Sequence, residues 1–463
     1  MPKETRRAKE PAGKLGLMGW ALFDWATQPF YTLVVTFLFA PYFVNGFMDD
    51  PADAQSLWAY TTGAAQLIAA VAAPVLGAIA DAGLPRKPWI AALSIPLIVG
   101  LCGLWFAIPG ETALIPLVLI SFGLAIIGAE LTTVFNNAMM LGLVSNRRLG
   151  TLSGLGWATG YVGGLVSLVL IAGLIVTDPD TGKTLFGLTP VLTLDAATRE
   201  GDRLVGPFSA LWYLVFVLPL FLFTPDRPDM PPQPNPVRAG LRRLVRSVRD
   251  LVRDHGNVVR FLLARMLYSD GLGAVFAFGG IYAASVFGWG AAELGLFGIV
   301  LIAAGTAGAC LGGVLDDRLG SKTVIVVALL FFIAGSVGVL SVDPDEILFL
   351  IAVTPKTEGS GLFAAAGEQA YLAFAMLIGF AAAPIQASSR ALLARISPPE
   401  KTTEFFGLFA FSGKITAFAA PLAIGVVTAL TDSQRIGISM SLVFLVAGLL
   451  LLLGVRISVR ASR

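Results

Sequence analysis

Long runs of apolar residues alternate along the chain with short clusters of glycine, proline and charged residues. A run of roughly 20 apolar residues can cross the hydrocarbon core of a bilayer as a helix. The pattern predicts twelve such spans, six on each side of a long polar segment, whereas the apolar stretch Ile347–Val353 is too short to span and is expected in a loop. The predicted spans cover residues 17–45, 57–80, 89–108, 113–141, 151–176, 207–223, 259–286, 293–315, 322–341, 368–394, 402–429 and 435–455.

The polar segment between the sixth and seventh spans divides the chain. It begins with the proline-rich stretch Pro225–Pro236, which cannot be helical throughout because proline lacks a backbone N–H. Leucines and valines then recur at helical spacing among the arginines of 241–253, which is typical of a basic amphipathic helix on a membrane face. A merely solvated charged linker is the alternative. We predict an N-terminal six-helix bundle at 1–223, a cytoplasmic linker at 224–258 and a C-terminal six-helix bundle at 259–463.

Composition agrees with a membrane protein, since 56% of the 463 residues are hydrophobic and 13% are charged. The net charge of +2 gives no indication of a nucleic-acid partner. When the loops are assigned to alternate sides, 25 lysines and arginines fall on the side of both termini and five on the other. Cytoplasmic loops carry this excess, so both termini are predicted to be cytoplasmic, with the protein in the cell (inner) membrane. The first 14 residues lack the apolar core of a removable signal peptide.

A short motif occurs twice, after the second span of each predicted bundle. Gly77 is followed after three residues by Asp81 and then by Arg86 and Lys87. Its counterpart runs from Gly313 through Asp317 and Arg318 to Lys322. The glycine allows two helices to approach closely, and the acid can accept hydrogen bonds at a helix end. The repeat indicates an internal duplication. We assign the following residues to gating contacts between the halves: Asp81, Arg86, Lys87, Asp317, Arg318 and Lys322.

This paired motif resembles that of the major facilitator superfamily, although Ala82 stands where a basic residue is usual. Further segments are similar to a subfamily that includes the fungal vacuolar amino-acid effluxers. They are Trp20–Pro29, Val134–Ala138, Ser153–Gly164, Leu267–Gly271, Gln386–Arg395 and Glu404–Lys414. The resemblance implies secondary transport by alternating access through a cavity lined by the first, fourth, seventh and tenth helices. It also implies export of amino acids as one activity, without determining the substrate of this chain.

Five charged residues fall inside predicted spans, where charge is costly and commonly functional. They are Asp24, Glu130, Arg265, Asp270 and Lys414. At about 1.5 Å of rise per residue, the three acids lie between the midplane and the cytoplasmic face, so they are expected to share one aqueous cavity. Any of the three is a candidate for the proton-coupling acid. Lys414 and Arg265 are candidates for neutralising an acid or holding a substrate carboxylate.

Neutral side chains on the same spans are candidates for hydrogen bonds to a polar substrate: Gln28, Asn136, Asn137 and Gln386. Some of the charged residues also allow simpler interpretations. Asp24 is close enough to the cytoplasmic interface to cap a helix, to form an ion pair there or to gate the cavity. Structural pairing alone is the alternative for Glu130 and Asp270, and Arg265 is close enough to a helix start to extend toward the interface. Arg390 and Arg395 are expected to be lipid-facing anchors or contacts between domains.

These observations predict a secondary active transporter that moves a small polar solute, with amino-acid efflux as one possibility, by proton-coupled alternating access. An uncoupled facilitator or uniporter is the alternative within transport. A lipid-handling protein or a sensor without solute flux is the alternative outside it. We expect no enzyme and no cofactor or metal, because the single histidine, His255, lies in the linker and no paired ligands are evident. The expected partners are a small-molecule substrate, a proton or other coupling ion and the lipid bilayer, and the expected state is a monomer.

Overall fold

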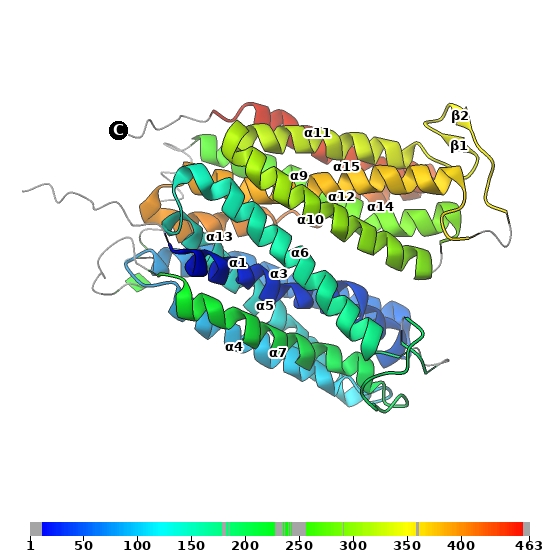
Figure 1. Cartoon of the computed structure of the whole chain (residues 1–463), viewed down its shortest axis with the longest axis horizontal. Coiled ribbons are helices and arrows are strands. Elements are labelled where there is room, and N and C mark those ends of the chain that lie inside the picture. The colour runs from blue at the N-terminus through cyan, green and yellow to red at the C-terminus, as the bar shows by residue number, and fades with distance from the viewer. Residues whose placement is uncertain are drawn as a thin grey trace, which may run out of the picture.

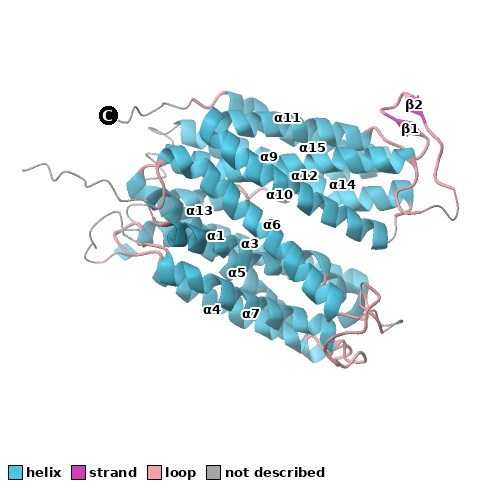
Figure 2. Cartoon of the chain, in the orientation of Figure 1, coloured by secondary structure: helices cyan, strands magenta, loops and turns pink. Residues whose placement is uncertain are grey.

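The computed structural model describes residues 12–177, 182–184, 186–226, 235, 237–238, 240, 242, 256–289, 291–357 and 361–456. Most of these residues are helical, and the helices run side by side along the long axis of the molecule (Figures 1 and 2). Eleven helical segments are long and apolar enough to cross a membrane, and a shorter apolar helix covers Ala419–Thr431. The prediction of an all-α membrane protein with twelve transmembrane helices in two six-helix bundles is confirmed.

The N-terminal bundle contains the first six spans. The first is a chain of short helical segments, of which α1 is the longest, and the next five are single long helices. The helices are α1 (Lys14–Pro29), α2 (Phe39–Tyr42), α3 (Pro51–Ala80), α4 (Lys87–Gly103), α5 (Ile115–Met139), α6 (Leu149–Leu174) and α7 (Glu200–Phe223). Short π or 3-10 segments are η1 (Phe30–Phe37), η2 (Phe43–Phe47), η3 (Leu104–Phe106), η4 (Thr112–Leu114), η5 (Met140–Gly142) and η6 (Asn146–Arg148). The helix α7 begins at Glu200. The predicted span began only at 207, because the start of the helix is polar and falls outside the apolar run.

The C-terminal bundle contains the other six spans. Its helices are α9 (Gly256–Phe287), α10 (Ala291–Leu319), α11 (Ser321–Leu340), α12 (Ala366–Ile396), α13 (Thr402–Ser412), α14 (Ala419–Thr431) and α15 (Gln434–Leu453), with the 3-10 turn η7 at Pro399–Lys401. The stretch predicted as a loop at Ile347–Val353 contains a small antiparallel hairpin, β1 (Glu346–Ile347) paired with β2 (Ile351–Ala352). Most of the predicted linker, including its amphipathic helix and His255, lies outside the described residues.

The prediction of one continuous helix over 402–429 is wrong. The chain forms turns at 413–418, between α13 and α14. Pro421 lies in the first turn of α14, where a proline is tolerated. In a continuous helix, a proline at 421 would leave the carbonyl of Ala417 without a partner and clash with it, a cost that α3, α4 and α12 accept at Pro74, Pro96 and Pro384. The eleventh span is two helices, and Lys414 lies at their junction in the cavity wall.

The two bundles touch along two equivalent pairs of helices. In the first pair, a Cβ added to Gly154 of α6 would lie 2.5 Å from the carbonyl oxygen of Ala309 in α10. In the second pair, a Cβ added to Gly407 of α13 would lie 2.5 Å from the Cα of Pro74 in α3. Glycine is needed at both positions because the backbones approach so closely. The bundles converge toward the end of the molecule that carries α13 and diverge toward the end that carries β1 and β2 (Figure 1).

Candidate functional site

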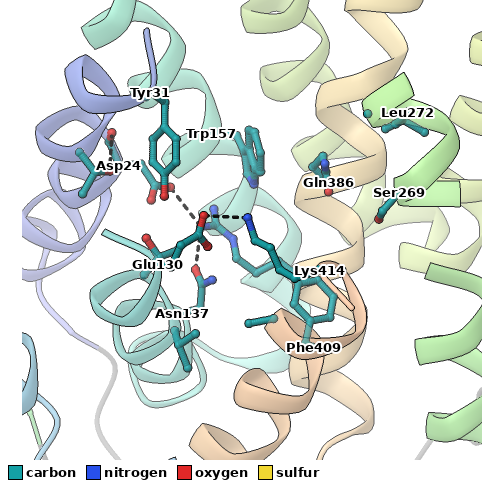
Figure 3. A pocket seen from close by; sticks show the side chains of 18 of the residues that line it. Asp24, Tyr31, Glu130, Asn137, Trp157, Ser269, Leu272, Gln386, Phe409 and Lys414 are labelled. Atoms are coloured by element: carbon teal, nitrogen blue, oxygen red, sulfur yellow. Dashed lines mark hydrogen bonds and ion pairs between the residues drawn. The ribbon is translucent and has the colours of Figure 1, made fainter. Parts of the chain in front are cut away.

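A cavity of about 480 Å³ lies between the two bundles. Residues of both bundles form its wall, the N-terminal ones mainly from α1, α5 and α6 and the C-terminal ones mainly from α9, α12 and α13. The polar and charged members of the wall are Asp24, Thr27, Gln28, Tyr31, Glu130, Thr133, Asn137, Trp157, Tyr161, Arg265, Ser269, Gln386, Arg390 and Lys414. Figure 3 shows Asp24, Tyr31, Glu130 and Asn137 on one side of the cavity and Gln386, Ser269 and Leu272 on the other.

One ion pair crosses this cavity at the break in the eleventh span. The ammonium of Lys414 donates to Glu130 Oε1 at 2.8 Å (Figure 3). Both side chains remain partly exposed, Lys414 at 25% and Glu130 at 18%. Because Lys414 belongs to the C-terminal bundle and Glu130 to the N-terminal one, the pair links the bundles inside the cavity and stays accessible to water.

A second ion pair crosses the cavity wall between Asp24 and Arg390. The guanidinium of Arg390 donates to Asp24 Oδ2 at 3.1 Å and to Asn137 Oδ1 at 3.0 Å. It also donates to the hydroxyl of Ser153 at 2.8 Å and to the carbonyl of Ser153 at 2.6 Å. Its carbon Cζ lies 5.0 Å from the ring centroid of Trp20. The predicted contact between domains is confirmed for Arg390, and the lipid-facing alternative is wrong, because the side chain is 5% exposed.

The close approach of α6 makes this arrangement possible. A Cβ added to Gly156 would lie 2.5 Å from Asp24 Oδ2 and 2.8 Å from a terminal nitrogen of Arg390. No side chain other than hydrogen fits there without moving the ion pair. The glycine therefore positions Asp24 and Arg390 against each other.

Arg265 points into the protein, so the alternative that it extends toward the interface is wrong. One terminal nitrogen donates to the carbonyl of Phe409 at 2.7 Å and reaches the hydroxyl of Ser412 at 3.4 Å. The guanidinium carbon lies 3.4 Å from the centroid of the Phe409 ring. Arg265 thus holds the C-terminal end of α13, where a cation is favoured by the helix dipole.

The cavity brings together most of the predicted site residues but excludes two. Gln28, Asn137 and Gln386 line it with the charged residues described above. Asn136 is 0% exposed and outside the wall, with its backbone carbonyl accepting from the indole of Trp20 at 2.8 Å. Asp270 is 4% exposed and also outside the wall, and neither of its carboxylate oxygens has a hydrogen-bond partner among the described residues. Two of the three predicted acids, and not all three, share the cavity.

Beside the start of α6, the bundles are joined through the second copy of the repeated motif. The carboxylate of Asp317 accepts from the backbone N–H groups of Gly150 at 2.8 Å and Thr151 at 2.9 Å. Arg395 pairs with Asp317 at 3.0 Å and also contacts Asp316, both within the C-terminal bundle. Its Nε donates to the carbonyl of Asn146 in the N-terminal bundle at 3.2 Å, so the predicted contact between domains is present for Arg395. An acid at a helix start satisfies N–H groups that have no partner within the helix.

The first copy of the motif makes the equivalent contact beside the start of α13. Asp81 Oδ2 accepts from the backbone N–H of Glu404 at 2.8 Å. Arg86 lies 3.5 Å from Asp81 and donates from Nε to the hydroxyl of Thr403 at 3.0 Å. Each half therefore caps a helix of the other half with the aspartate of its own motif. We call this end of the molecule, defined by Asp81, Gly150, Asp317 and Glu404, the closed end.

Among the described residues, the other residues predicted to gate make contacts within one bundle or lie at the surface. Lys87 donates to the carbonyl of Phe221 at 3.0 Å, at the end of α7. Lys322 donates to the carbonyls of Leu453 and Val455, both at 2.8 Å, at the end of α15. Arg318 is exposed at the surface. These two lysines tie the third span to the sixth and the ninth to the twelfth, so they hold each half together.

The opposite end differs, because the ion pairs we describe there remain within one bundle. Lys356 pairs with Glu368 at 3.2 Å, and this hydrogen bond raises the pKa of Lys356. Arg199 pairs with Asp202 at 2.7 Å. Contacts between the bundles therefore close the cavity on the side of the closed end. The ion pairs of the described residues at the opposite end, which we call the open end, make no such link.

Ser153 and Asp316 belong to this network but were not predicted from the sequence. Serine is common in transmembrane helices, so its type gives no signal, and Asp316 is adjacent to an acid already assigned. Arg390 was not predicted as a residue of the cavity. It lies inside an otherwise apolar predicted span, and a charge in such a span is the signal that identifies it.

Comparison with known proteins supports these observations. A family model described as "Vacuole effluxer Atg22 like" matches residues 43–462. An uncharacterized MFS-type transporter, YxiO, of Bacillus subtilis is 23% identical over 94% of this chain and 93% of its own. Autophagy-related protein 22-2 of Aspergillus clavatus is 25% identical over 60% of this chain, which spans 43% of that longer relative.

Solved structures agree on the fold. The transporter FucP in the outward conformation superimposes with a TM-score of 0.69 at 14% identity, covering 96% of this chain and 99% of its own. A variant of the same protein, the E. coli fucose:proton symporter, gives a TM-score of 0.68 at 14% identity, covering 96% of this chain and 98% of its own. The family match, the helical fold and the cavity between the two bundles all indicate the same class of protein. The chain belongs to the vacuole effluxer Atg22-like family of major facilitator superfamily transporters.

Proposed function

We propose that this protein is a proton-coupled secondary transporter that moves a small polar solute across the cell membrane, as a monomer, by alternating access. Amino acids are the first solute class to test, because the family resemblance implies amino-acid efflux. The observation that carries the proposal is the cavity between the bundles, walled by Asp24, Glu130, Arg390 and Lys414 and sealed at the closed end. A volume of about 480 Å³ is in the range of small-molecule sites.

The positive-inside bias supports an orientation with the closed end facing the cytoplasm. The cavity is then accessible from outside in this conformation, and the opposite state requires the capping contacts of Asp81 and Asp317 to separate. In both contacts a backbone N–H at a helix start donates to an aspartate. These hydrogen bonds can break and reform without leaving a side chain buried and unpaired. This gives a physical route for rocking one bundle against the other.

Glu130 is the acid best placed to couple the solute to a proton. It lines the cavity, is partly exposed and contacts Lys414 across the two bundles. A proton arriving through the cavity would neutralise Glu130 and release Lys414. The released ammonium then changes both the attraction between the bundles and the charge presented to the solute.

Asp270 is a second candidate for the proton site, and a different observation favours it. Its carboxyl group is buried without a hydrogen-bond partner among the described residues, and an ionised carboxylate is costly to bury in this way. Because it does not line the cavity, a proton could reach Asp270 only after the surrounding helices move. Glu130 needs no such movement.

Transport into proteoliposomes tests this function. An imposed pH gradient should drive accumulation of radiolabelled solute from an amino-acid set, and Glu130→Gln should abolish accumulation while exchange without a gradient continues. Glu111→Gln, at an exposed loop position, is the matched control and should accumulate like the wild type.

Different results separate the alternatives. Flux of the wild type that ignores the pH gradient would make the protein a uniporter. Loss of accumulation in Asp270→Asn with normal accumulation in Glu130→Gln would move the proton site to Asp270. The absence of flux for every amino acid and carboxylate tried would favour a lipid-handling or sensing role.

A further inference from the structure

The five charged side chains that line the cavity do not balance. Asp24 is paired with Arg390 at 3.1 Å, and Glu130 is paired with Lys414 at 2.8 Å. Arg265 makes no ion pair with any carboxylate of the described residues. If both pairs are ionised, the residues of the wall itself carry one excess positive charge, located at Arg265 on α9. Asp270, buried behind the wall, interacts electrostatically with Arg265 without forming an ion pair with it.

Arg265 is held in place by contacts that leave part of its hydrogen-bonding capacity unused. The ring of Phe409 lies against the guanidinium plane, and one terminal nitrogen donates to the carbonyl of Phe409. The Nε atom is buried and has no acceptor among the described residues. A guanidinium carries five N–H donors in a rigid fork, so an orientation fixed in this way leaves donors available to a ligand.

Ser269 adds a second unused donor beside Arg265. It lies four residues further along α9, so both side chains are on the same face of the helix. Ser269 lines the cavity, and its buried hydroxyl has no hydrogen-bond partner among the described residues. Gln386 of α12 lies on the same side of the cavity as Ser269 (Figure 3). Among the described residues that line the cavity, Arg265 and Ser269 are the two with a buried side-chain polar atom that lacks a partner, and they lie about one helical turn apart, so one ligand group in the cavity would complete both.

We propose that Arg265 and Ser269 form the subsite that binds a carboxylate group of the transported solute. The planar fork of arginine matches a carboxylate, and a single excess positive charge matches one negative charge better than the charge of nearly two on a phosphate ester. Leu272 and Phe276, about one and two turns beyond Ser269 on α9, form an apolar part of the wall that suits the apolar part of the solute. This inference rests on the proposed function in one respect, namely that the cavity is the solute site.

The contact of Arg265 with the end of α13 does not by itself explain the arrangement. A cation at a helix C-terminus accounts for the terminal nitrogen that donates to Phe409. It does not account for the buried Nε or for the hydroxyl of Ser269. Capping and solute binding are therefore compatible, and they predict different results for substitutions at Ser269, which makes no contact with α13 that we describe.

Equilibrium binding to the purified full-length protein in detergent tests the subsite. The probes share one carbon skeleton: L-leucine, 4-methylpentanoate and L-leucinamide, with inorganic phosphate as a fourth probe. Thermal stabilisation should be seen with the two carboxylates at millimolar concentration and should be absent or at least about tenfold weaker with the amide and with phosphate. Ser269→Ala should weaken carboxylate binding several-fold and Arg265→Gln about tenfold or more.

Arg260→Gln is the matched control, because Arg260 lies on the same helix, is exposed and donates to the carbonyl of Gly454 outside the cavity. It should bind the carboxylates like the wild type. Should Arg265→Gln unfold, Ser269→Ala alone decides the result. Equal stabilisation by amide and carboxylate, unchanged binding in Ser269→Ala, or no stabilisation by either carboxylate would overturn the subsite. Carboxylate binding without any flux in proteoliposomes would leave the subsite standing and remove the transport function.

Discussion

Two ion pairs cross the same cavity, and they are built differently. Each joins an acid of the N-terminal bundle to a base of the C-terminal bundle. Arg390 is 5% exposed and has four hydrogen bonds, of which the one to Asp24 is only one. Lys414 is 25% exposed, lies at a helix break and has one hydrogen bond that we describe, to Glu130. The first pair resembles a structural clamp, and the second an exchangeable contact.

Burial explains the difference in energetic terms. A buried charge that loses its partner is costly, because neither water nor another group replaces the lost interaction. An accessible pair contributes little, because water solvates each partner when they separate. The Arg390 cluster therefore stabilises the conformation in which the closed end is sealed, whereas the Glu130–Lys414 pair can open and close during transport at small cost.

The largest effect is expected for Arg390→Gln. It leaves Asp24 without its cation and removes the donors to Asn137 and Ser153, at a cost of about 3–5 kcal/mol. Thermal unfolding in detergent should show a marked fall in the midpoint, and transport should be lost. The double variant Asp24→Asn with Arg390→Gln should recover part of the stability, because no unpaired charge then remains. An unchanged unfolding midpoint in Arg390→Gln would show that the Asp24–Arg390 pair is not a structural clamp.

A smaller effect is expected at the closed end, for Asp317→Asn. The amide keeps the shape of the side chain but loses charge-assisted hydrogen bonds to Gly150 and Thr151, worth about 1.5–3 kcal/mol relative to the sealed state. The protein should therefore populate the conformation open at this end. The measurement is labelling of a cysteine placed at Ala410, in the cavity wall, by an impermeant reagent from the side of the closed end.

Asp81→Asn is the internal comparison for this experiment. It removes the charge from the equivalent contact with Glu404, so it should shift the labelling in the same direction. Both native cysteines, Cys102 and Cys310, are exposed on the described surface and need to be replaced first. Unchanged labelling in both variants would mean that the Arg390 cluster alone holds the end closed.

The sequence was sufficient to predict the spans because a bilayer imposes a minimum length of apolar helix. The hydrophobic pattern did not predict the break at 413–418, because it takes no account of Gly413 or Pro421, which disfavour a continuous helix. At the break, Pro421 is accommodated in the first turn of α14 and Arg265 of another helix supports the end of α13. Contacts between distant parts of the chain cannot be obtained from a hydrophobic pattern.

The sequence predicted many residues of the site, but it did not predict which of them form ion pairs with each other. Asp24, Glu130 and Lys414 stood out because charge inside an apolar span is costly. Which base pairs with which acid depends on how two bundles meet, and Asp270 shows the same limit. A rise of about 1.5 Å per residue gives the depth of Asp270 along its helix. It does not give the direction of the side chain around the helix axis, and in the structure Asp270 lies outside the cavity wall.

The Glu130–Lys414 pair should contribute little to stability. A double-mutant cycle with Glu130→Gln and Lys414→Met should give a coupling energy of no more than about 1 kcal/mol, because both side chains are partly exposed. The same cycle on Asp24 and Arg390 should give a clearly larger value. Unfolding midpoints of the four variants in each cycle provide the measurement. Equal coupling energies for the two pairs would contradict the distinction between clamp and exchangeable contact.

The smallest effects are expected for the two lysines that hold each half together. Lys322→Met and Lys87→Met each remove an ammonium from carbonyls at a helix end, a change of about 0.3–1 kcal/mol. The cost should be larger at Lys322, which contacts the carbonyls of Leu453 and Val455, than at Lys87, which contacts that of Phe221. Because neither bridges the bundles, neither should change the labelling at Ala410. If Lys322→Met shifted that labelling as far as Asp317→Asn does, the repeated motif would gate through its basic residues as well as through its aspartates.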